Sequence, residues 1–361
     1  MQVSIIDKNI TVFLVIITTS VLILPAFCAI IRVRRHKVYC KIKVGKELNM
    51  STPTLLVLIG IPASGKSTAA KNLKKEGYIV LSSDEIRSEI YGVGFPADEK
   101  ERARLRAAIF NRIKKDTKDH LAKGESVVVD ATNLNRKKRM KLLSHLESTP
   151  CHKKALLFIT SIEVCKERNS RRDEDTRVPD KDMMRLMRGF EMPISSEGWD
   201  EITPVIDSEK YEFPFELLAD FNQDNPHHTL TLGEHMAAAE KYAKVHEYSE
   251  KLIKICRLHD IGKLYTKEFR NYKGEPSRIA HYYGHENLGA YLYLTMELCG
   301  KDRDEYEIKK ILYEAALINC HMRPLTAWKD SLTAKERDKA LFGEDFVSDI
   351  EKINAADKSA H

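Results

Sequence analysis

The pattern of apolar and polar positions divides the 361-residue chain into three parts. Residues 11–31 are apolar and carry no charge. Later, short apolar runs alternate with polar segments, and four runs suit buried strands of a parallel sheet: 55–58, 78–81, 127–130 and 155–159. After residue 226 the segments suit helices and carry histidines. The pattern predicts an α/β domain with a parallel sheet of three to five strands over residues 51–205, a linker over 206–225, and an all-α domain over 226–361.

The first 50 residues contain a candidate transmembrane segment. Residues 11–31, about 21 residues at about 1.5 Å each, would cross a hydrocarbon core of about 30 Å. Lysines and arginines follow between residues 32 and 43, so the positive-inside rule places the rest of the chain in the cytoplasm. The alternative is a start assigned too early, because Met50 lies directly before the first strand of the α/β domain. Both explanations, a membrane anchor with a basic linker or a wrong start, stay open.

Composition sets only broad limits. The chain is 43% hydrophobic and 31% charged, which is typical of globular proteins. A formal charge of +6 permits a nucleic-acid partner, although much of the excess lies just after residue 31. The seven cysteines form no C-x-x-C pair, so neither a zinc ribbon nor a disulfide framework is predicted. A reducing compartment fits this usage.

A glycine-rich loop follows the first predicted strand. Gly60 to Thr68 spell GIPASGKST and match G-x-x-x-x-G-K-[ST], with a helical pattern after them. Backbone N–H groups of such a loop surround phosphates at a helix start. Lys66 would reach the β- and γ-phosphates of ATP, and the Ser67 hydroxyl would bind Mg²⁺. The expected nucleotide-binding residues of this loop are Gly60, Ser64, Gly65, Lys66, Ser67 and Thr68.

Two further strands end in a carboxylate, at the sheet edge where open α/β sheets bind ligands. Asp84 is placed to accept a proton from an attacking hydroxyl, and Arg87 to hold an acceptor phosphate. The alternative for Asp84 is a helix N-cap. Asp130 is placed to act near Mg²⁺ or phosphates and Asn133 to bind a ligand phosphate, although isolated residues of these types are more often turn formers.

A basic run, residues 165–179, follows the fourth predicted strand and contains Arg168 and Arg172. Such a run is usually a solvated helix face. Its place between a strand and Pro179 instead suits a lid over a nucleotide, where arginines stabilise a transferring phosphoryl group.

The ordered motifs GIPASGKST, SSDEIR, VVVDATNLNR, ERNSRR and RVP, within residues 54–200, resemble the phage-type polynucleotide 5′-kinases. The resemblance implies a P-loop fold with Lys66 and Ser67 on ATP and Mg²⁺. It implies Asp84 as the general base for a 5′-hydroxyl and Arg87 on the acceptor phosphate. The supporting and lid residues that it implies are Asp130, Asn133, Arg168 and Arg172, with Arg172 as the main clamp on the ATP phosphates.

The C-terminal part contains an adjacent His259-Asp260 pair. Consecutive helical side chains point about 100° apart, so the pair could bind one metal only at its edges or bridge two metals. Histidine and carboxylate ligands suit Mn²⁺, Fe, Ni²⁺ or Co²⁺ with water as the nucleophile. A lone histidine is more often structural.

The histidine series over residues 225–357, with HDIGK and a downstream Ala-Asp, resembles the HD-domain metal-dependent phosphohydrolases. The resemblance implies that the core ligands are His235, His259, Asp260 and Asp357. His285 and His321 would support a second metal, and Lys263 would bind substrate phosphate. His281 is expected outside the ligand set. The chain ends four residues after Asp357, which predicts a short last helix.

Together the two resemblances predict a bifunctional enzyme that heals nucleic-acid ends. One half would phosphorylate a 5′-hydroxyl of RNA or DNA from ATP, and the other would hydrolyse a 2′,3′-cyclic phosphate or 3′-phosphate. Two alternatives remain: a small-molecule or nucleotide kinase fused to an HD nucleotidase, and a membrane-tethered sensor that binds ATP and RNA without turnover. The sequence leaves the oligomeric state open.

Overall fold

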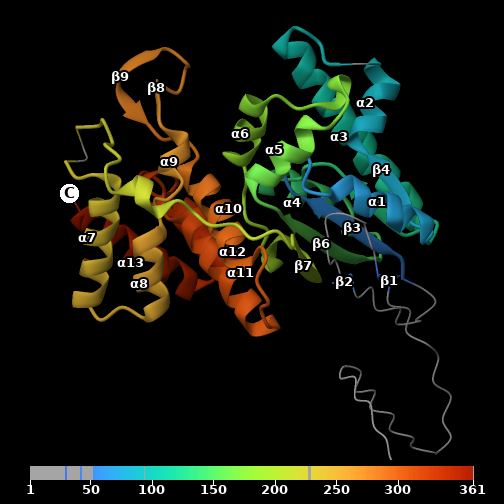
Figure 1. The fold of residues 1–361 in the computed structure, drawn as a ribbon. Coiled ribbons are helices and arrows are strands. Elements are labelled where there is room, and N and C mark those ends of the chain that lie inside the picture. Colours follow the sequence, from blue (N-terminus) through green and yellow to red (C-terminus); the bar gives the residue numbers. More distant parts are fainter. Residues whose placement is uncertain (1–28, 31–40, 43–51, 93, 227–228, 361) are drawn as a thin grey trace, which may run out of the picture.

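The computed structural model describes residues 29–30, 41–42, 52–92, 94–226 and 229–360 (Figure 1). Two short strands, β1 (Ala29–Ile30) and β2 (Lys41–Ile42), pair antiparallel. The rest of the candidate transmembrane segment lies outside the described residues. Within the described ranges, no helix combines the length and the apolar character needed to cross a membrane.

The N-terminal half is built on one parallel sheet. Its strands lie in the order β4-β5-β3-β6-β7, so β3 lies at the centre. Their bounds are β3 (Thr54–Ile59), β4 (Ile79–Ser82), β5 (Val127–Asp130), β6 (His152–Ile159) and β7 (Glu201–Ile206). The four predicted strands are confirmed. Strand β7 was not predicted, because Pro204 and two charged or polar positions, Glu201 and Thr203, hide its pattern. Proline is tolerated at a sheet edge.

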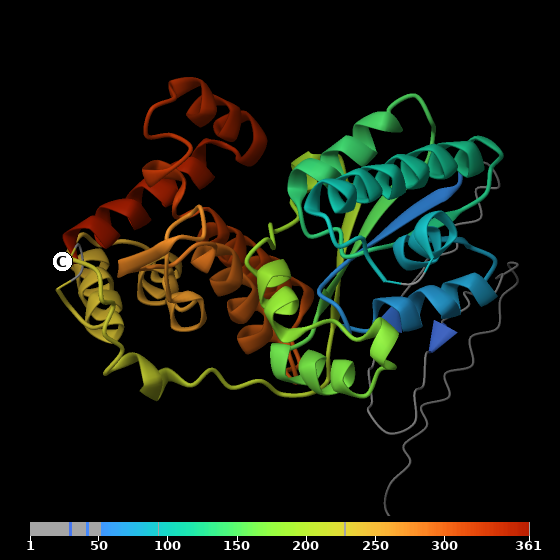
Figure 2. The same ribbon diagram turned by 90° about the horizontal axis from the view of Figure 1, so that it is seen from above.

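Helices cover both faces of the sheet (Figure 2), and alternate residues of β3 pack against different helices. Leu56 and Leu58 pack with α1 on one face, whereas Leu55 and Val57 pack with α3 and α4 on the other. The helices of this half are α1 (Lys66–Lys75), α2 (Ser83–Tyr91), α3 (Glu99–Ala122), α4 (Arg136–His145), α5 (Ile162–Ser170) and α6 (Asp180–Met187). The arrangement is an α/β P-loop fold with both faces covered.

The C-terminal half is mainly helical. Its helices are α7 (Leu232–Val245), α8 (Glu250–Leu258), α9 (Lys263–Thr266), α10 (His285–Leu298), α11 (Glu305–Cys320), α12 (Leu332–Phe342) and α13 (Glu344–Ser359). A hairpin of β8 (Glu268–Arg270) and β9 (Pro276–His281) interrupts them, so the all-α prediction is incomplete.

The prediction of a short last helix is wrong. Helix α13 has 16 residues, because it begins at Glu344 and packs along α7 and α8. Asp357 lies in its last turn.

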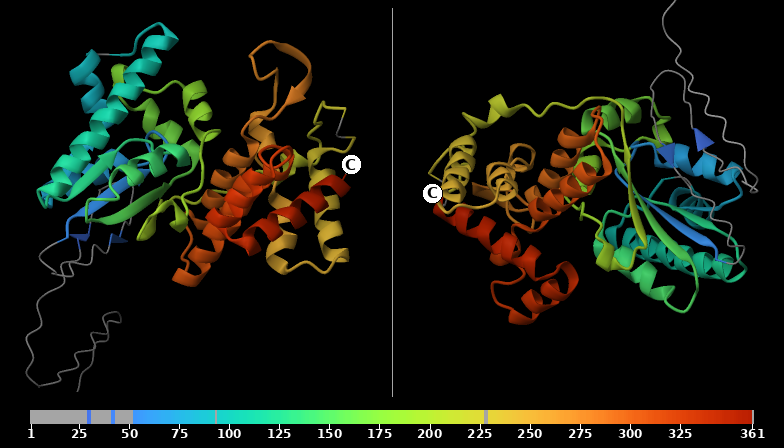
Figure 3. Two further views of the ribbon diagram at one scale, coloured as in Figure 1. Left: turned by 180° about the vertical axis from the view of Figure 1, so that it is seen from behind. Right: turned by 90° about the horizontal axis from the view of Figure 1, so that it is seen from below.

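The two halves share one hydrophobic core. Tyr291 of α10 is fully buried, donates a hydrogen bond to the Thr160 carbonyl at the end of β6 (2.8 Å), and meets Phe190 edge-on at 5.3 Å. Between the halves, residues 207–226 contain only a 3₁₀ turn (Phe215–Leu218), yet Tyr211 and Phe213 are buried. Figure 3 shows the helical half packed closely against the sheet half. Tyr211 and Phe213 of the connecting segment belong to the same hydrophobic core.

Candidate active sites

The loop between β3 and α1 has backbone conformations that suit phosphate binding. Gly65 has φ 99°, and Ala63 has φ 62°, a value that non-glycine residues rarely adopt. At Gly60 a Cβ atom would lie 2.8 Å from Ser64 Oγ and 3.0 Å from Phe158 Cβ, so only glycine fits. Ser67 and Thr68 are exposed in the first turn of α1, which contains no acidic residue. The helix start is therefore open to an anion.

Lys66 lies across this loop. Its side chain is buried, and Nζ donates a hydrogen bond to the Ile61 carbonyl at 2.6 Å. Burial lowers the pKa of Lys66 to about 8, against the attraction of Asp130 and Asp84, while the charge of Arg172 lowers it further. The structure thus brings carboxylates from the ends of two strands, and the arginine after α5, within electrostatic range of one ammonium group.

Asp130 ends β5 beside the phosphate loop. It is 8% exposed and accepts a hydrogen bond from Ser67. Burial raises the pKa of Asp130, while the Ser67 hydrogen bond and the Lys66 charge oppose that rise. A hydroxyl and a buried carboxylate in contact are suitable oxygen ligands for Mg²⁺.

Asn133 has a role that its sequence position did not indicate. Its φ is 48°, and its amide nitrogen donates to the Leu58 carbonyl at 2.8 Å. The side chain therefore fastens the loop after β5 to the central strand. Its predicted contact with a ligand phosphate stays a prediction.

Asp84 is an accessible carboxylate in the first turn of α2. Its side chain is 70% exposed and lies 3.5 Å from Arg87 Nη1. Ser82 caps the helix by accepting from the Glu85 backbone N–H, so the N-cap alternative for Asp84 is wrong. The Arg87 guanidinium stacks on Phe95 at 4.4 Å. Asp84 is thus free of a capping role, and Arg87 is held beside it.

The two predicted lid arginines differ in their surroundings. Arg168 Nη1 forms an ion pair with the buried Asp207 Oδ2 at 2.7 Å. Asp207 also accepts from Thr160 Oγ1 (3.2 Å), which lies 3.3 Å from the Ser64 carbonyl. Arg168 therefore supports the phosphate loop from behind, whereas Arg172 is close enough to Lys66 to affect its pKa.

Six predicted ligand residues of the C-terminal half form one buried cluster. Two groups have ligand atoms within 4.8 Å of one another and share Asp260. The first contains His235, His259, Asp260 and Asp357, and the second contains Asp260, His285 and His321. They come from α7, the end of α8, the start of α10, the end of α11, and α13.

The four histidines point the same ring nitrogen into the cluster. The Nδ1 atoms of His235, His285 and His321 each lie 2.7 Å from a backbone carbonyl, and that of His259 lies 2.9 Å from one. A carbonyl only accepts, so each Nδ1 carries the proton and each Nε2 of a neutral ring presents a lone pair. This contact orients metal-binding histidines in general.

Asp260 connects the two groups. Its Oδ2 lies 3.2 Å from His235 Nε2 and 3.4 Å from His259 Nε2, and its Oδ1 lies 3.1 Å from His285 Nε2 and 3.5 Å from His321 Nε2. Burial disfavours the ionised form, but Lys263 and His259 hold the pKa of Asp260 well below its usual range. The carboxylate is placed to bridge two cations.

The donor set fits divalent transition metals. His285 Nε2 and His321 Nε2 lie 3.2 Å apart, and two lone pairs at this distance repel unless a cation or proton lies between them. The buried His259 Nε2 makes no hydrogen bond among the described residues. Nitrogen and carboxylate ligands of this kind suit Mn²⁺, Fe, Ni²⁺ or Co²⁺.

Lys263 lies against the cluster. It is 5% exposed, and its Nζ lies 2.7 Å from Asp260 Oδ2 and donates to Gln223 Oε1 at 3.1 Å. His281 lies outside the ligand groups, stacked on Tyr283, as expected. Gln223 was missed because it lies in the predicted linker, where its sequence surroundings gave no signal.

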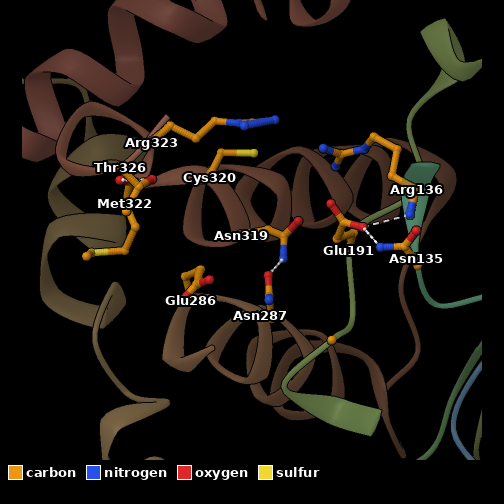
Figure 4. A pocket seen from close by; sticks show the side chains of 11 residues that line it. Asn135, Arg136, Glu191, Glu286, Asn287, Asn319, Cys320, Met322, Arg323 and Thr326 are labelled. Atoms are coloured by element: carbon orange, nitrogen blue, oxygen red, sulfur yellow. Dashed lines mark hydrogen bonds between the residues drawn. The ribbon is translucent and has the colours of Figure 1, made fainter. Parts of the chain in front are cut away.

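A pocket of about 230 Å³ lies between the two halves (Figure 4). Asn319, which precedes the cluster residue His321 in sequence, holds the halves together there. It accepts from the Met192 N–H (3.0 Å) and donates to the Phe190 carbonyl (3.0 Å) and to Asn287 Oδ1 (2.9 Å). This joining role was not predicted, because the two partners of Asn319 in the N-terminal half are backbone groups.

Residues 55–193 match the family model for an AAA domain. The matched region contains the phosphate loop and Asp130, and it coincides with the α/β P-loop fold of the N-terminal half. The family model ends at residue 193, before the histidine and aspartate cluster begins.

Comparisons with individual proteins add detail. The chain is 28% identical over 180 residues, 48% of its length, to the "Putative bifunctional polynucleotide kinase/RNA ligase" of Autographa californica nuclear polyhedrosis virus. It spans a quarter (25%) of that relative's length. The structure of a "putative kinase" from Chloroflexus aurantiacus matches 43% of the present chain and 86% of the Chloroflexus chain (20% identity, TM-score 0.37). A structure of the Pnkp1/Rnl/Hen1 RNA repair complex matches 40% of this chain and 46% of the compared chain in that complex (20% identity, TM-score 0.34).

Proposed function

We propose that this protein is a bifunctional enzyme that heals nucleic-acid ends. The P-loop half would phosphorylate a 5′-hydroxyl from ATP, and the helical half would hydrolyse a 2′,3′-cyclic phosphate or 3′-phosphate. The observation that carries the proposal is a pair of complete phosphate-handling sites on one shared core. The viral relative described as a polynucleotide kinase and RNA ligase supports a polynucleotide acceptor.

In the kinase site, each residue has a separate task. The N–H groups of the loop and the Lys66 ammonium bind the ATP phosphates, and Ser67 and Asp130 hold Mg²⁺. Asp84 accepts the proton of the attacking 5′-hydroxyl, which its exposed carboxylate can reach, while Arg87 binds the neighbouring acceptor phosphate. Arg172 stabilises the charge that develops on the transferred group.

In the helical half, the side chains would hold two metal ions. His235, His259, Asp260 and Asp357 would bind one, and Asp260, His285 and His321 the other. Bound metals of this kind polarise phosphoryl oxygens and lower the pKa of water to give a nucleophile at neutral pH. The backbone carbonyls at Nδ1 hold the four rings in the ligating orientation, and Lys263 binds a substrate phosphate beside Asp260.

The two activities suit opposite ends of one break. Endonucleases that leave a 5′-hydroxyl and a 2′,3′-cyclic phosphate produce ends that a ligase cannot join directly. The 5′-phosphate made by the first reaction is ligatable. The second reaction gives a ligatable end once hydrolysis has opened the cyclic phosphate and released the resulting 3′-phosphate, which leaves a 3′-hydroxyl. The proposed location of both sites is the cytoplasm, with or without an N-terminal membrane anchor, and the substrate is RNA or DNA.

The test uses one synthetic RNA with a 5′-hydroxyl and a 2′,3′-cyclic phosphate. The full chain is incubated with ATP, Mg²⁺ and either Mn²⁺ or Ni²⁺, and both ends are read by mass spectrometry. We expect gain of a 5′-phosphate and loss of the cyclic phosphate. Lys66→Ala should remove only the first change, and Asp260→Asn only the second.

Parallel reactions contain nucleosides and nucleoside 2′,3′-cyclic phosphates. Phosphorylation of nucleosides but not RNA would favour a small-molecule or nucleotide kinase fused to a nucleotidase. No turnover of either kind, with ATP and RNA still bound, would favour the sensor alternative.

A further inference from the structure

The β8–β9 hairpin is an addition to the helical half that lies beside the metal cluster. It begins just after α9, which carries Lys263, and ends just before α10, whose first residue is His285. Figures 1 and 3 show that it projects beyond the helices. The chain therefore leaves the metal site, forms an exposed arm, and returns to the same site.

The arm exposes aromatic rings. Tyr272 is 79% exposed near the tip, and Phe269 in β8 is 48% exposed. At its base, Tyr283 is 39% exposed and stacks nearly parallel on His281, at 5.3 Å. A single exposed aromatic side chain is ordinary, but three on one short arm offer a row of flat surfaces.

The arm is also positively charged. Arg270, Lys273 and Arg278 are all exposed and, among the described residues, form no ion pair. The two acids of the arm have partners: Glu268 lies 3.1 Å from Arg188, and Glu275 accepts from Asn271 at 2.7 Å. Asn271 is neutral, so Glu275 keeps its charge, and the arm carries three unpaired cations against one unpaired carboxylate among the described residues. Its net charge is therefore positive.

The base of the arm is firmly attached. Lys267 lies 2.5 Å from Asp224, and the Ala280 N–H donates to the Asp224 carbonyl at 2.8 Å. Next to this contact, Gln223 accepts from Tyr282 through its backbone carbonyl and from Lys263 through Oε1. Arg188 of the kinase half contacts Glu268. These contacts fix the arm relative to Lys263 and hence to the cluster.

We propose that the hairpin binds single-stranded RNA next to its 3′ end and directs the terminal phosphate to the metal cluster. Exposed aromatic rings stack on unpaired bases, and neighbouring lysines and arginines neutralise phosphates. The proposal rests on the proposed function. It specifies a polynucleotide, rather than a free nucleotide, as the substrate of the helical half.

The first test measures affinity. The probe is a single-stranded RNA of about ten nucleotides with a 5′-phosphate and a 3′-phosphate, followed by fluorescence anisotropy. We expect Tyr272→Ala to weaken binding about tenfold, the effect of one lost stacked base. Arg278→Ala should also reduce the slope of log affinity against log salt by about 0.7. The matched control is Tyr306→Ala on α11, where Tyr306 is 78% exposed and distant in sequence from the hairpin.

The second test locates the 3′ end. The same RNA with 4-thiouridine beside its 3′ end is cross-linked to the full chain, and the linked peptide is identified by mass spectrometry. Cross-links within residues 267–283 are expected. Unchanged affinity in Tyr272→Ala and Arg278→Ala together with cross-links confined to the kinase half would overturn the proposal.

The outcomes separate this proposal from the proposed function. If the chain hydrolyses the cyclic phosphate but the hairpin variants and cross-links show no role for the hairpin, the proposed function stands and RNA binding by the hairpin is refuted. If RNA cross-links to the hairpin but the wild-type chain hydrolyses nothing, RNA binding by the hairpin stands and the proposed hydrolase activity is refuted. Equal hydrolysis of a nucleoside 2′,3′-cyclic phosphate by wild type and Tyr272→Ala is expected, since a mononucleotide has no neighbouring base to stack on Tyr272 near the tip.

Discussion

The two candidate sites are built in different ways. The phosphate loop is contiguous, from Gly60 to Thr68, and binds through backbone groups whose geometry depends on a few unusual φ angles. The metal cluster takes single side chains from elements spread between His235 and Asp357. The first site depends on local conformation, and the second on the packing of five helical segments.

This difference predicts different responses to substitution. Asp84 beside the phosphate loop is accessible and contributes little to the core, although Lys66 and Asp130 are buried. Cluster residues are buried, and each histidine is also bonded to a backbone carbonyl. Changes at Asp84 should therefore affect chemistry alone, whereas changes in the cluster should affect the proposed metal binding and stability together.

The largest expected effect is at Asp84. Asp84→Asn removes the proposed general base and should lower kcat for 5′-phosphorylation by about 10²–10⁴-fold, without changing the thermal unfolding midpoint. Radiolabelled phosphate transfer and a thermal melt measure the two quantities. Glu85→Gln, on the neighbouring exposed residue, is the control. A kcat within twofold of wild type would assign the base role elsewhere.

Asp260→Asn is the corresponding change in the metal cluster. Since Asp260 belongs to both ligand groups, metal affinity at both positions should fall at least about 100-fold. Titration calorimetry with Mn²⁺ measures this, and kinase activity should remain. Asp345→Asn, on an exposed aspartate of α13, is the control. Two ions bound at wild-type affinity would show that Asp260 does not bridge them.

Asn319→Ala tests the joint between the halves. It removes three hydrogen bonds and leaves buried backbone groups without partners, so the free energy of unfolding should fall by about 2–4 kcal/mol. Denaturant unfolding measures this loss. The exposed Asn111→Ala on α3 should have little effect. Wild-type stability in Asn319→Ala would mean that the joint contributes nothing.

The depressed pKa of Lys66 predicts proton uptake on ATP binding. Above pH 8 the free enzyme holds a neutral Lys66, and bound phosphates favour the charged form, so ATP affinity should fall by up to about tenfold per pH unit there. The free energy of unfolding depends on pH with the opposite sign to ATP affinity. The unfolded chain, with a pKa near 10.5, binds more protons between pH 8 and 10.5, so this group makes stability rise with pH.

Calorimetry in two buffers of different ionisation enthalpy measures this proton uptake. Lys66→Met should abolish it, while Lys71→Met on the exposed face of α1 should not. Uptake that persists in Lys66→Met would assign the proton to another group.

The smallest expected effect is at the shared core. Tyr291→Phe removes one buried hydrogen bond to Thr160 and should cost about 1 kcal/mol, with the two halves still unfolding in one transition. Fluorescence and circular dichroism during denaturant unfolding measure it. Two separate transitions in the wild-type chain would show instead that the halves fold independently.

Features encoded by neighbouring residues could be predicted from the sequence. The four buried strands follow from short apolar runs, and the loop from Gly60 to Thr68 follows from its spacing. The histidine and aspartate series also named the six side chains that the structure brings together. Asp130 was predicted for the same reason, since a carboxylate that ends a parallel strand must lie at the ligand edge.

Features that depend on distant partners could not be predicted. Strand β7 exists because β6 offers it an edge, although Pro204 weakens its own pattern. Arg168 was expected on ATP, but Asp207, distant in sequence, pairs with it. Gln223 lies against Lys263 only because the connecting segment folds back over the cluster.

The sequence by itself determined the local chemistry: a glycine-rich loop with the spacing of a phosphate site, carboxylates at strand ends, and a series of histidine and aspartate side chains suited to metals. Backbone geometry and strand burial are short-range properties, so a few adjacent residues specify them. Only the tertiary structure decided that the four rings point Nε2 inward, that Asp260 faces both groups, and that Tyr291 and Asn319 join the halves. These are long-range contacts, and each is set by the packing of segments that share no local signal.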